Sequence, residues 1–200
     1  MEHLIYTNPY SLSNELCNDI IRKYEKEGTA KYEGVTQGGL NKLLKNTTDF
    51  IIPIDGDNEW HNIHKLLEVE LTKNVILYNK QFNHIDFNDD KKNNYRVIPS
   101  DKLSVNNFMI QRYIKGVGKY VYHNDFRVDW EKKSYRVLTF LFYLNTVEEG
   151  GHTEFWGNYK IKPETGKLLL FPASWTFPHC GKTPISDNKY IITGWLYTVE

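Results

Sequence analysis

Four short segments dominate the second half of the chain: Y-H-N-D-F (122–126), G-G-H-T-E-F (150–155), P-H-C-G-K-T-P (178–184) and N-K-Y-I-I-T-G-W (188–195). They supply His123, Asp125 and His179, in the order His-x-Asp…His. Residues two apart on a strand point to the same face, so His123 and Asp125 are predicted to face one point. His179 returns much later in the chain, as a closed or sandwiched β-fold would allow.

These three side chains predict a metal site with open positions. Two imidazoles and one carboxylate form the facial triad typical of non-haem Fe(II), which leaves the other coordination positions for substrates. Structural zinc usually takes four protein ligands, often cysteines, and no cysteines cluster here. His84-x-Asp86 repeats the first half of the pattern, but it lies in a polar stretch without the downstream companions. We therefore predict that iron binds His123, Asp125 and His179.

From Leu103 onward the chain reads almost continuously as short strands separated by turns, with a long apolar strand over 135–145. In the last strand Lys189, Thr193 and Trp195 share one face, which offers a cation, a hydroxyl and an aromatic wall. Such a face suits a carboxylate ligand. The predicted fold class is α+β, mainly β: a double-stranded β-helix (jelly roll, cupin-like) core with N-terminal helices packed on one sheet.

The N-terminal half carries helical signals. Ser11 or Ser13 caps a helix that runs to about Glu27, with apolar residues at four-residue steps. Asp57 begins a second helix that runs to about Tyr78 and backs onto a sheet.

Residues 29–49 contain three glycines and weak periodicity, which predicts a long loop with one helical turn at most. This loop is either a lid over the substrate or an ordinary surface loop. No second domain or repeat is visible. We expect a single domain over 1–200, in which 1–102 forms a helical and loop support and 103–200 forms the catalytic core.

Composition argues against several classes of protein. The net charge of zero gives no electrostatic footprint for nucleic acid, and the 40% hydrophobic content suits a sizeable core. Two cysteines, Cys17 and Cys180, do not indicate a disulfide framework and favour a reducing cytoplasm. Met1 is followed by no signal-peptide pattern, and the apolar runs are far shorter than the ~20 residues of a membrane helix. We expect a soluble, cytoplasmic protein without nucleic-acid or membrane partners.

The motifs between about 104 and 199 resemble the 2-oxoglutarate- and Fe(II)-dependent dioxygenases, in particular the prolyl 4-hydroxylase-like branch. The resemblance rests on Tyr113, His123-x-Asp125, R-V-L-T (136–139), Y-L-N (143–145), G-G-H-T-E-F (150–155), I-K-P-E-T-G (161–166), His179 and K-Y-I-I-T-G-W (189–195). These motifs follow the order found in the family.

The resemblance implies roles for further residues. Lys189, ten positions after His179, would bind the far carboxylate of 2-oxoglutarate, with Tyr113 hydrogen-bonded to it and Thr193 beside it. The implied cofactors are Fe(II), 2-oxoglutarate and O2, with ascorbate as a reductant that keeps iron in its reduced state.

Three residues are assigned to the substrate side of the pocket. Trp195 would line the pocket, and Arg127 would reach its mouth, although a surface salt bridge explains Arg127 equally well. His152 stands where the family often has glutamate, so it would lie on the rim of the site or have no role.

The implied reaction is hydroxylation of a C–H bond with release of succinate and CO2, most simply on a prolyl residue of a peptide or protein. A free amino acid or small metabolite is an alternative substrate within the same chemistry. A non-catalytic jelly-roll binding module and a cupin-like isomerase are alternatives from other classes. An intact triad together with Lys189 argues against both of these.

Overall fold

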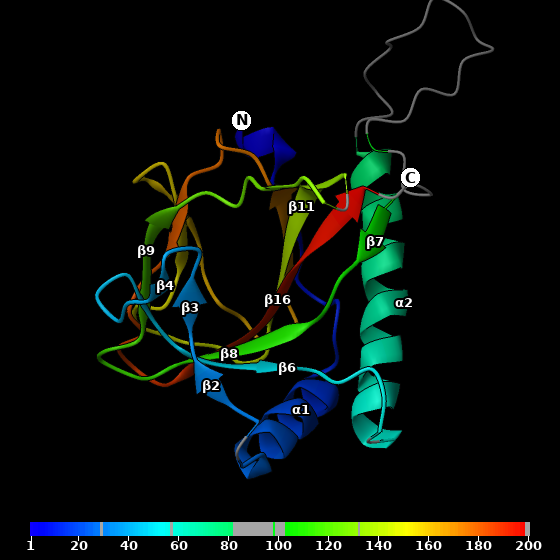
Figure 1. The fold of residues 1–200 in the computed structure, drawn as a ribbon. Helices are drawn as coiled ribbons and strands as arrows, with labels where there is room; N and C mark the ends of the chain where they lie inside the picture. Colours follow the sequence, from blue (N-terminus) through cyan, green and yellow to red (C-terminus); the bar gives the residue numbers. More distant parts are fainter. Residues whose placement is uncertain (29, 57, 82–97, 99–102, 132, 199–200) are drawn as a thin grey trace, which may run out of the picture.

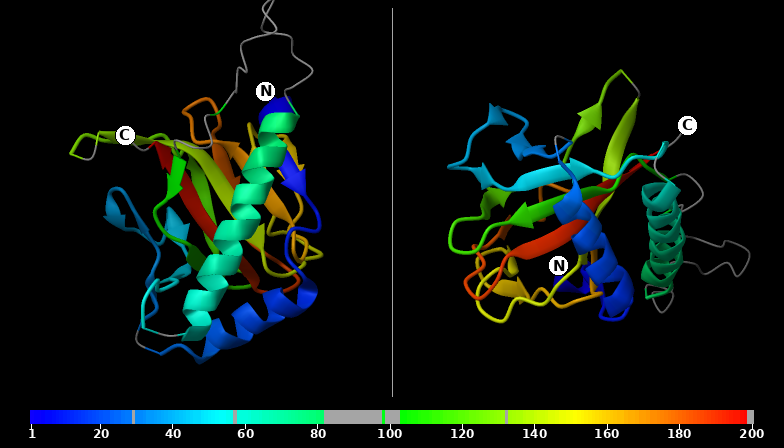
Figure 2. Two further views of the ribbon diagram at one scale, coloured as in Figure 1. Left: turned by 90° about the vertical axis from the view of Figure 1, so that its right-hand side faces the viewer. Right: turned by 90° about the horizontal axis from the view of Figure 1, so that it is seen from below.

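The computed structural model describes residues 1–28, 30–56, 58–81, 98, 103–131 and 133–198. Two helices lie on the outer face of a large antiparallel sheet, and a smaller sheet faces the other side of it (Figures 1 and 2). The predicted fold class, a mainly β jelly-roll core with N-terminal helices on one sheet, is confirmed.

The helices are α1 (Asn14–Lys26) and α2 (Asn58–Lys80), preceded by a 3-10 turn at Glu2–Leu4. Ser13 caps α1, since its hydroxyl accepts a hydrogen bond from the Leu16 N–H at 3.2 Å. The side chains that bury these helices against the large sheet are mostly apolar and include Ile20, Tyr24, Trp60, Leu67 and Leu71. Among the described helices, none is long and apolar enough to cross a membrane.

The large sheet contains nine strands. Seven follow one another in the order β1 (Tyr6–Asn8), β14 (Leu168–Pro172), β11 (Ser134–Tyr143), β16 (Lys189–Thr198), β8 (Met109–Tyr113), β6 (Thr48–Ile51) and β2 (Tyr32–Glu33). The other two are β10 (Val128–Asp129), which pairs with β11, and β7 (Leu103–Val105), which pairs with β16.

Strand alternation divides the interior into two layers. On β11, Leu138, Phe140 and Phe142 face the helices and join their core. The intervening Leu141 and Tyr143 face the smaller sheet and join a second cluster with residues such as Phe155, Phe171 and Ile191. The long apolar strand predicted over 135–145 is therefore central and buried on both faces.

The smaller sheet has the strand order β13 (Tyr159–Ile161), β12 (Thr153–Phe155), β15 (His179–Gly181), β9 (Lys119–His123) and β5 (Lys45–Asn46). A separate hairpin joins β3 (Val35–Thr36) to β4 (Gly39–Leu40). The two sheets form the walls of a cavity, and their facing sides carry the polar residues described below.

The structure corrects the prediction of one long loop over residues 29–49. The chain there is not one long loop, because it contributes β2 and the start of β6 to the large sheet and β5 to the smaller one. Each of β2, β3, β4 and β5 has only two residues, which is too short to show an alternating pattern in the sequence. The N-terminal half therefore supplies strands to both sheets as well as helices.

Candidate metal centre

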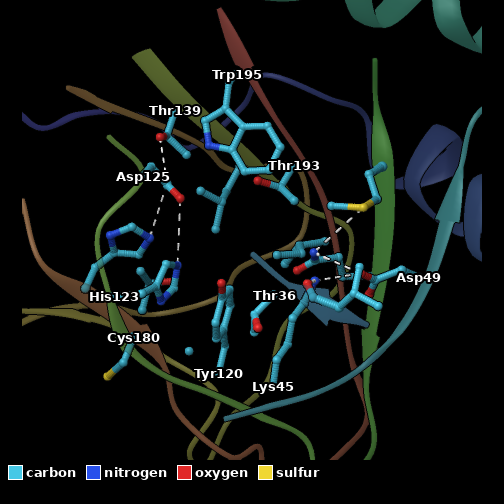
Figure 3. Close-up of a pocket in the computed structure, with 18 of the residues that line it drawn as sticks. Thr36, Lys45, Asp49, Tyr120, His123, Asp125, Thr139, Cys180, Thr193 and Trp195 are labelled. Atoms are coloured by element: carbon cyan, nitrogen blue, oxygen red, sulfur yellow. Dashed lines mark hydrogen bonds and ion pairs between the residues drawn. The ribbon is translucent and has the colours of Figure 1, made fainter. Parts of the chain in front are cut away.

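The three predicted metal ligands meet on two neighbouring strands of the smaller sheet. His123 ends β9 and His179 begins β15, and the two residues are paired directly across the antiparallel ladder. Asp125 lies two residues beyond the end of β9, so it reaches the site from a loop and not from the strand that we predicted. One donor atom from each of the three lies within 4.8 Å of the others. Figure 3 shows His123 and Asp125 turned toward each other, with Thr139 beside the carboxylate.

Hydrogen bonds fix the orientation of each ligand. Nδ1 of His123 lies 2.8 Å from the Val121 carbonyl oxygen, and Nδ1 of His179 lies 3.0 Å from that of Phe177. Both Nε2 atoms therefore face the carboxylate, at 3.8 Å from Asp125 Oδ1 and 3.5 Å from Oδ2. Partners of this kind set the tautomer and direction of metal-binding histidines.

The Asp125 carboxylate is also held in place from the large sheet. The Thr139 hydroxyl, on β11, donates a hydrogen bond of 2.7 Å to Asp125 Oδ2. Tyr120 stacks on the His123 ring at 3.6 Å between centroids and 15° between planes. The triad is therefore supported by both sheets.

The ionisation of the triad suits a divalent cation. Burial, and then the neighbouring His179, lower the pKa of His123 to about 4, which keeps that imidazole neutral at pH 7. Burial alone would raise the pKa of Asp125, but the two imidazoles, the Thr139 hydrogen bond and Arg136 together hold it below its usual value. Neutral imidazole and carboxylate are the forms that bind metal. Three protein ligands with open positions are the donor set of non-haem Fe(II) sites.

The triad opens into a cavity of about 480 Å³ between the sheets. Lys189, at the start of β16, projects into it and is only 1% exposed. Its ammonium donates one hydrogen bond, of 2.7 Å, to the Gly151 carbonyl oxygen and lies 4.4 Å from the centroid of the Tyr113 ring. No carboxylate among the described residues pairs with it. Burial therefore lowers the pKa of Lys189 to about 7.

A second buried cation lies in the cavity wall. Lys45 on β5 pairs with Asp49 on β6 at 2.6 Å, and the two side chains are 4% and 1% exposed. Thr47 donates to the same carboxylate at 2.7 Å, and Gln111 lies 3.4 Å from it. Gln111 in turn accepts a 3.2 Å hydrogen bond from the Tyr113 hydroxyl. The ion pair is thus connected to a residue predicted to bind 2-oxoglutarate.

The other predicted site residues are placed as follows. Thr193 lines the cavity and donates to the Phe140 carbonyl oxygen at 2.9 Å, and Trp195 lines it next to Arg136, whose guanidinium lies 3.5 Å from the indole centroid. Arg127 is exposed at the cavity mouth. His152 is not among the lining residues. It lies next to Glu154, with 3.3 Å between Nε2 and Oε2.

Several residues of the site were missed in the sequence. Thr139 stands inside the R-V-L-T motif and Gln111 shares a strand face with Tyr113, so a signal existed for both. Lys45 and Asp49 fall within the predicted loop over residues 29–49, where no periodicity marks them. The His84-x-Asp86 pattern lies outside the described residues.

A jelly roll whose two sheets enclose an open two-histidine, one-carboxylate triad and a buried lysine without a carboxylate partner among the described residues has the arrangement that an iron-dependent oxygenase with an anionic cosubstrate needs. Comparison with known families agrees: the model of the 2OG-Fe(II) oxygenase superfamily matches residues 108–197. The matched part of the chain carries the triad and Lys189, and its similarity to that superfamily agrees with the resemblance seen in the sequence. A search among curated proteins found no match.

Solved structures share the whole fold. A viral collagen prolyl hydroxylase from Paramecium bursaria Chlorella virus-1, in complex with 2-oxoglutarate, is 21% identical with a TM-score of 0.65, covering 98% of this chain and 97% of the other. A Pseudomonas putida prolyl-4-hydroxylase is 16% identical, with a TM-score of 0.65 and coverages of 96% and 92%. A Trichoplax adhaerens prolyl hydroxylase, in complex with a hypoxia-inducible factor peptide, is 19% identical, with a TM-score of 0.67 and coverages of 98% and 84%.

Proposed function

We propose that this protein is an Fe(II)- and 2-oxoglutarate-dependent dioxygenase that hydroxylates a C–H bond of a prolyl residue in a peptide or protein, with release of succinate and CO2. The observation that carries this proposal is the pairing of the open triad with Lys189 in one cavity. A buried ammonium without an anionic partner is costly, and the second carboxylate of 2-oxoglutarate supplies that partner.

The residues of the site would bind two different groups, the metal and 2-oxoglutarate. His123, Asp125 and His179 would hold iron, and a set of three protein ligands would leave positions for the keto acid end of 2-oxoglutarate and for O2. Lys189 binds the far carboxylate, and Tyr113 rotates its hydroxyl from Gln111 toward it. Bound iron would activate O2, the oxidant, of which one atom enters succinate as 2-oxoglutarate loses CO2 and the other enters the hydroxylated product. Ascorbate keeps the metal in the ferrous state.

The protein contributes positioning and exclusion of water. Lys189 and Ile191 are almost fully buried, so the cosubstrate end of the cavity is closed by packed side chains. Thr139 holds the Asp125 carboxylate in its metal-facing rotamer. Arg127 lines the cavity and is exposed, so the target C–H bond can approach the triad from its side. A prolyl residue is favoured as the target because the similar folds named above are those of prolyl hydroxylases.

The test is succinate formation by purified protein with Fe(II), 2-oxoglutarate and ascorbate, with and without proline-containing peptides. We expect slow succinate release without peptide, stimulation by peptide, and a product heavier by one oxygen atom on proline. His179→Ala and Lys189→Met serve as controls that remove a metal ligand and the carboxylate partner.

The outcomes separate the alternatives. Succinate release that only a free amino acid stimulates would move the target to a small molecule. Binding of iron and 2-oxoglutarate without any succinate would assign the chain to the non-catalytic binding modules.

A further inference from the structure

The cavity does not end at the triad. A second hollow, of about 580 Å³, adjoins it, and the two share Arg127, Arg136 and Trp195 in their walls. We call this second hollow the outer groove. Its remaining lining is mostly polar: Ser104, Val105, Asn106, Asp129, Ser134, Tyr197 and Thr198. The lining comes from β7, β10, the start of β11 and the end of β16.

One face of β16 runs through both hollows. Lys189, Ile191 and Thr193 line the inner cavity, Trp195 lines both, and Tyr197 lines the outer groove. Burial decreases along this face, from 1% exposed at Lys189 to 7% at Thr193 and partial exposure at Trp195 and Tyr197. At ~3.3 Å per residue, the trough is about 25 Å long from Lys189 to Tyr197. 2-Oxoglutarate and one amino acid are too short to fill it, whereas an extended peptide of several residues fits.

The outer groove is lined by three charged side chains, those of Arg127, Arg136 and Asp129. Arg136 is fixed in its floor, because its guanidinium lies on Trp195 and its Nε donates to the Tyr197 hydroxyl at 3.0 Å. Arg127 lies exposed beside it and has no carboxylate partner among the described residues. Asp129, the one acidic side chain among the described lining residues, already has an interaction of its own.

Arg136 lies close to Asp125, whereas Arg127 has no carboxylate partner among the described residues, so Arg127 is the guanidinium left to attract an anion where the groove meets the cavity. We propose that the outer groove binds the extended chain flanking the oxidised residue, and that Arg127 selects a flanking Asp or Glu by pairing with its carboxylate. This inference rests on the proposed function and names the sequence feature that its peptide substrate carries. A guanidinium matches a carboxylate in a two-pronged geometry, so the preference is for carboxylate over carboxamide.

The experiment uses a panel of proline peptides in which one Glu or one Gln is placed at each position on either side of the proline. Binding is measured by fluorescence anisotropy with Fe(II) and 2-oxoglutarate under nitrogen, and turnover by kcat/KM in air. We expect Glu to exceed Gln by about five- to tenfold in both measures, at positions on one side of the proline. Arg127→Gln should abolish that ratio, and Arg127→Glu should reverse it in favour of a Lys peptide.

Arg22→Gln is the matched control, because it removes the same charge from α1, far from the groove. The ratio should survive in that variant. Equal binding of Glu and Gln peptides, or a Glu preference that persists in Arg127→Gln, would overturn the inference while peptide turnover upholds the proposed function. Absence of turnover with carboxylate-dependent binding would overturn the hydroxylation and keep the groove assignment. Displacement of the peptide by a short single-stranded oligonucleotide would assign the groove to nucleic acid and overturn the inference.

Discussion

Replacing Lys189 by methionine tests the cosubstrate pocket without any turnover assay. Burial lowers the pKa of this lysine from 10.5 to about 7. At about 1.4 kcal/mol per pKa unit, holding the charged form in the folded protein costs about 5 kcal/mol. That cost is fully present below pH 7, where the lysine is charged in both states, and it disappears as the pH rises toward 10.5. Between pH 6 and pH 9, wild-type stability should therefore rise by about 3 kcal/mol through this one group.

Methionine keeps the apolar stem of Lys189 and removes the charge. The variant should be more stable than wild type at pH 6, and its advantage should shrink by about 3 kcal/mol at pH 9. Urea unfolding of the cofactor-free proteins at the two pH values measures the difference in the free energy of unfolding between variant and wild type. Other titrating groups contribute equally to both proteins and cancel from this difference. Lys115→Met, at an exposed position, controls for the loss of a lysine.

2-Oxoglutarate should reduce the stability advantage of Lys189→Met over wild type. With Fe(II) under nitrogen, a concentration 100 times the Kd should stabilise wild type by about 3 kcal/mol and Lys189→Met much less. A stability difference that is the same at pH 6 and pH 9 would refute the reasoning, because it would mean that Lys189 already has an anionic partner. Equal stabilisation of both proteins by 2-oxoglutarate would show that the cosubstrate binds elsewhere.

Three further tests address the surrounding structure. Lys45→Met leaves Asp49 buried without its partner, so urea unfolding should show that the free energy of unfolding falls by about 3–5 kcal/mol. Adding Asp49→Asn should restore part of that stability. An unchanged free energy of unfolding would mean that the pair contributes nothing. Gly181→Ala places a Cβ 3.1 Å from the Tyr113 ring, so the ring must shift. The KM for 2-oxoglutarate should then rise by about fivefold, with iron affinity unchanged. An unchanged KM would exclude a role for the position of the ring. His179→Ala should abolish iron binding and turnover, and residual turnover would remove this residue from the metal site.

The sequence was most informative where side chains repeat with the period of a strand. The face formed by Lys189, Thr193 and Trp195 could be predicted because β16 is ten residues long and alternates along its whole length. The cap at Ser13 was predictable because it is a local hydrogen bond. The three predicted metal ligands, which the structure brings together, could be picked out from the motifs around them.

What the sequence did not reveal depends on contacts between distant segments. Lys45 and Asp49 form a buried pair only because β5 and β6 are positioned by their partners β9 and β8. Arg136 was recognised within a motif, but its place on Trp195 depends on the pairing of β11 with β16. Asp125 lies beyond its strand because β9 ends at His123, and no local signal marks that boundary.

The pairing of N-terminal strands with strands of the C-terminal half has a practical consequence for shortened versions of this protein. Residues 108–197 contain the triad and Lys189, and their isolation is an obvious experiment. Removing the preceding residues would strip β8, β9 and β14 of their neighbours β6, β5 and β1 and leave three open edges. It would also uncover the apolar face of β11 that the helices protect. Open edges beside an exposed apolar face promote self-association, so such a fragment should aggregate before it can bind iron.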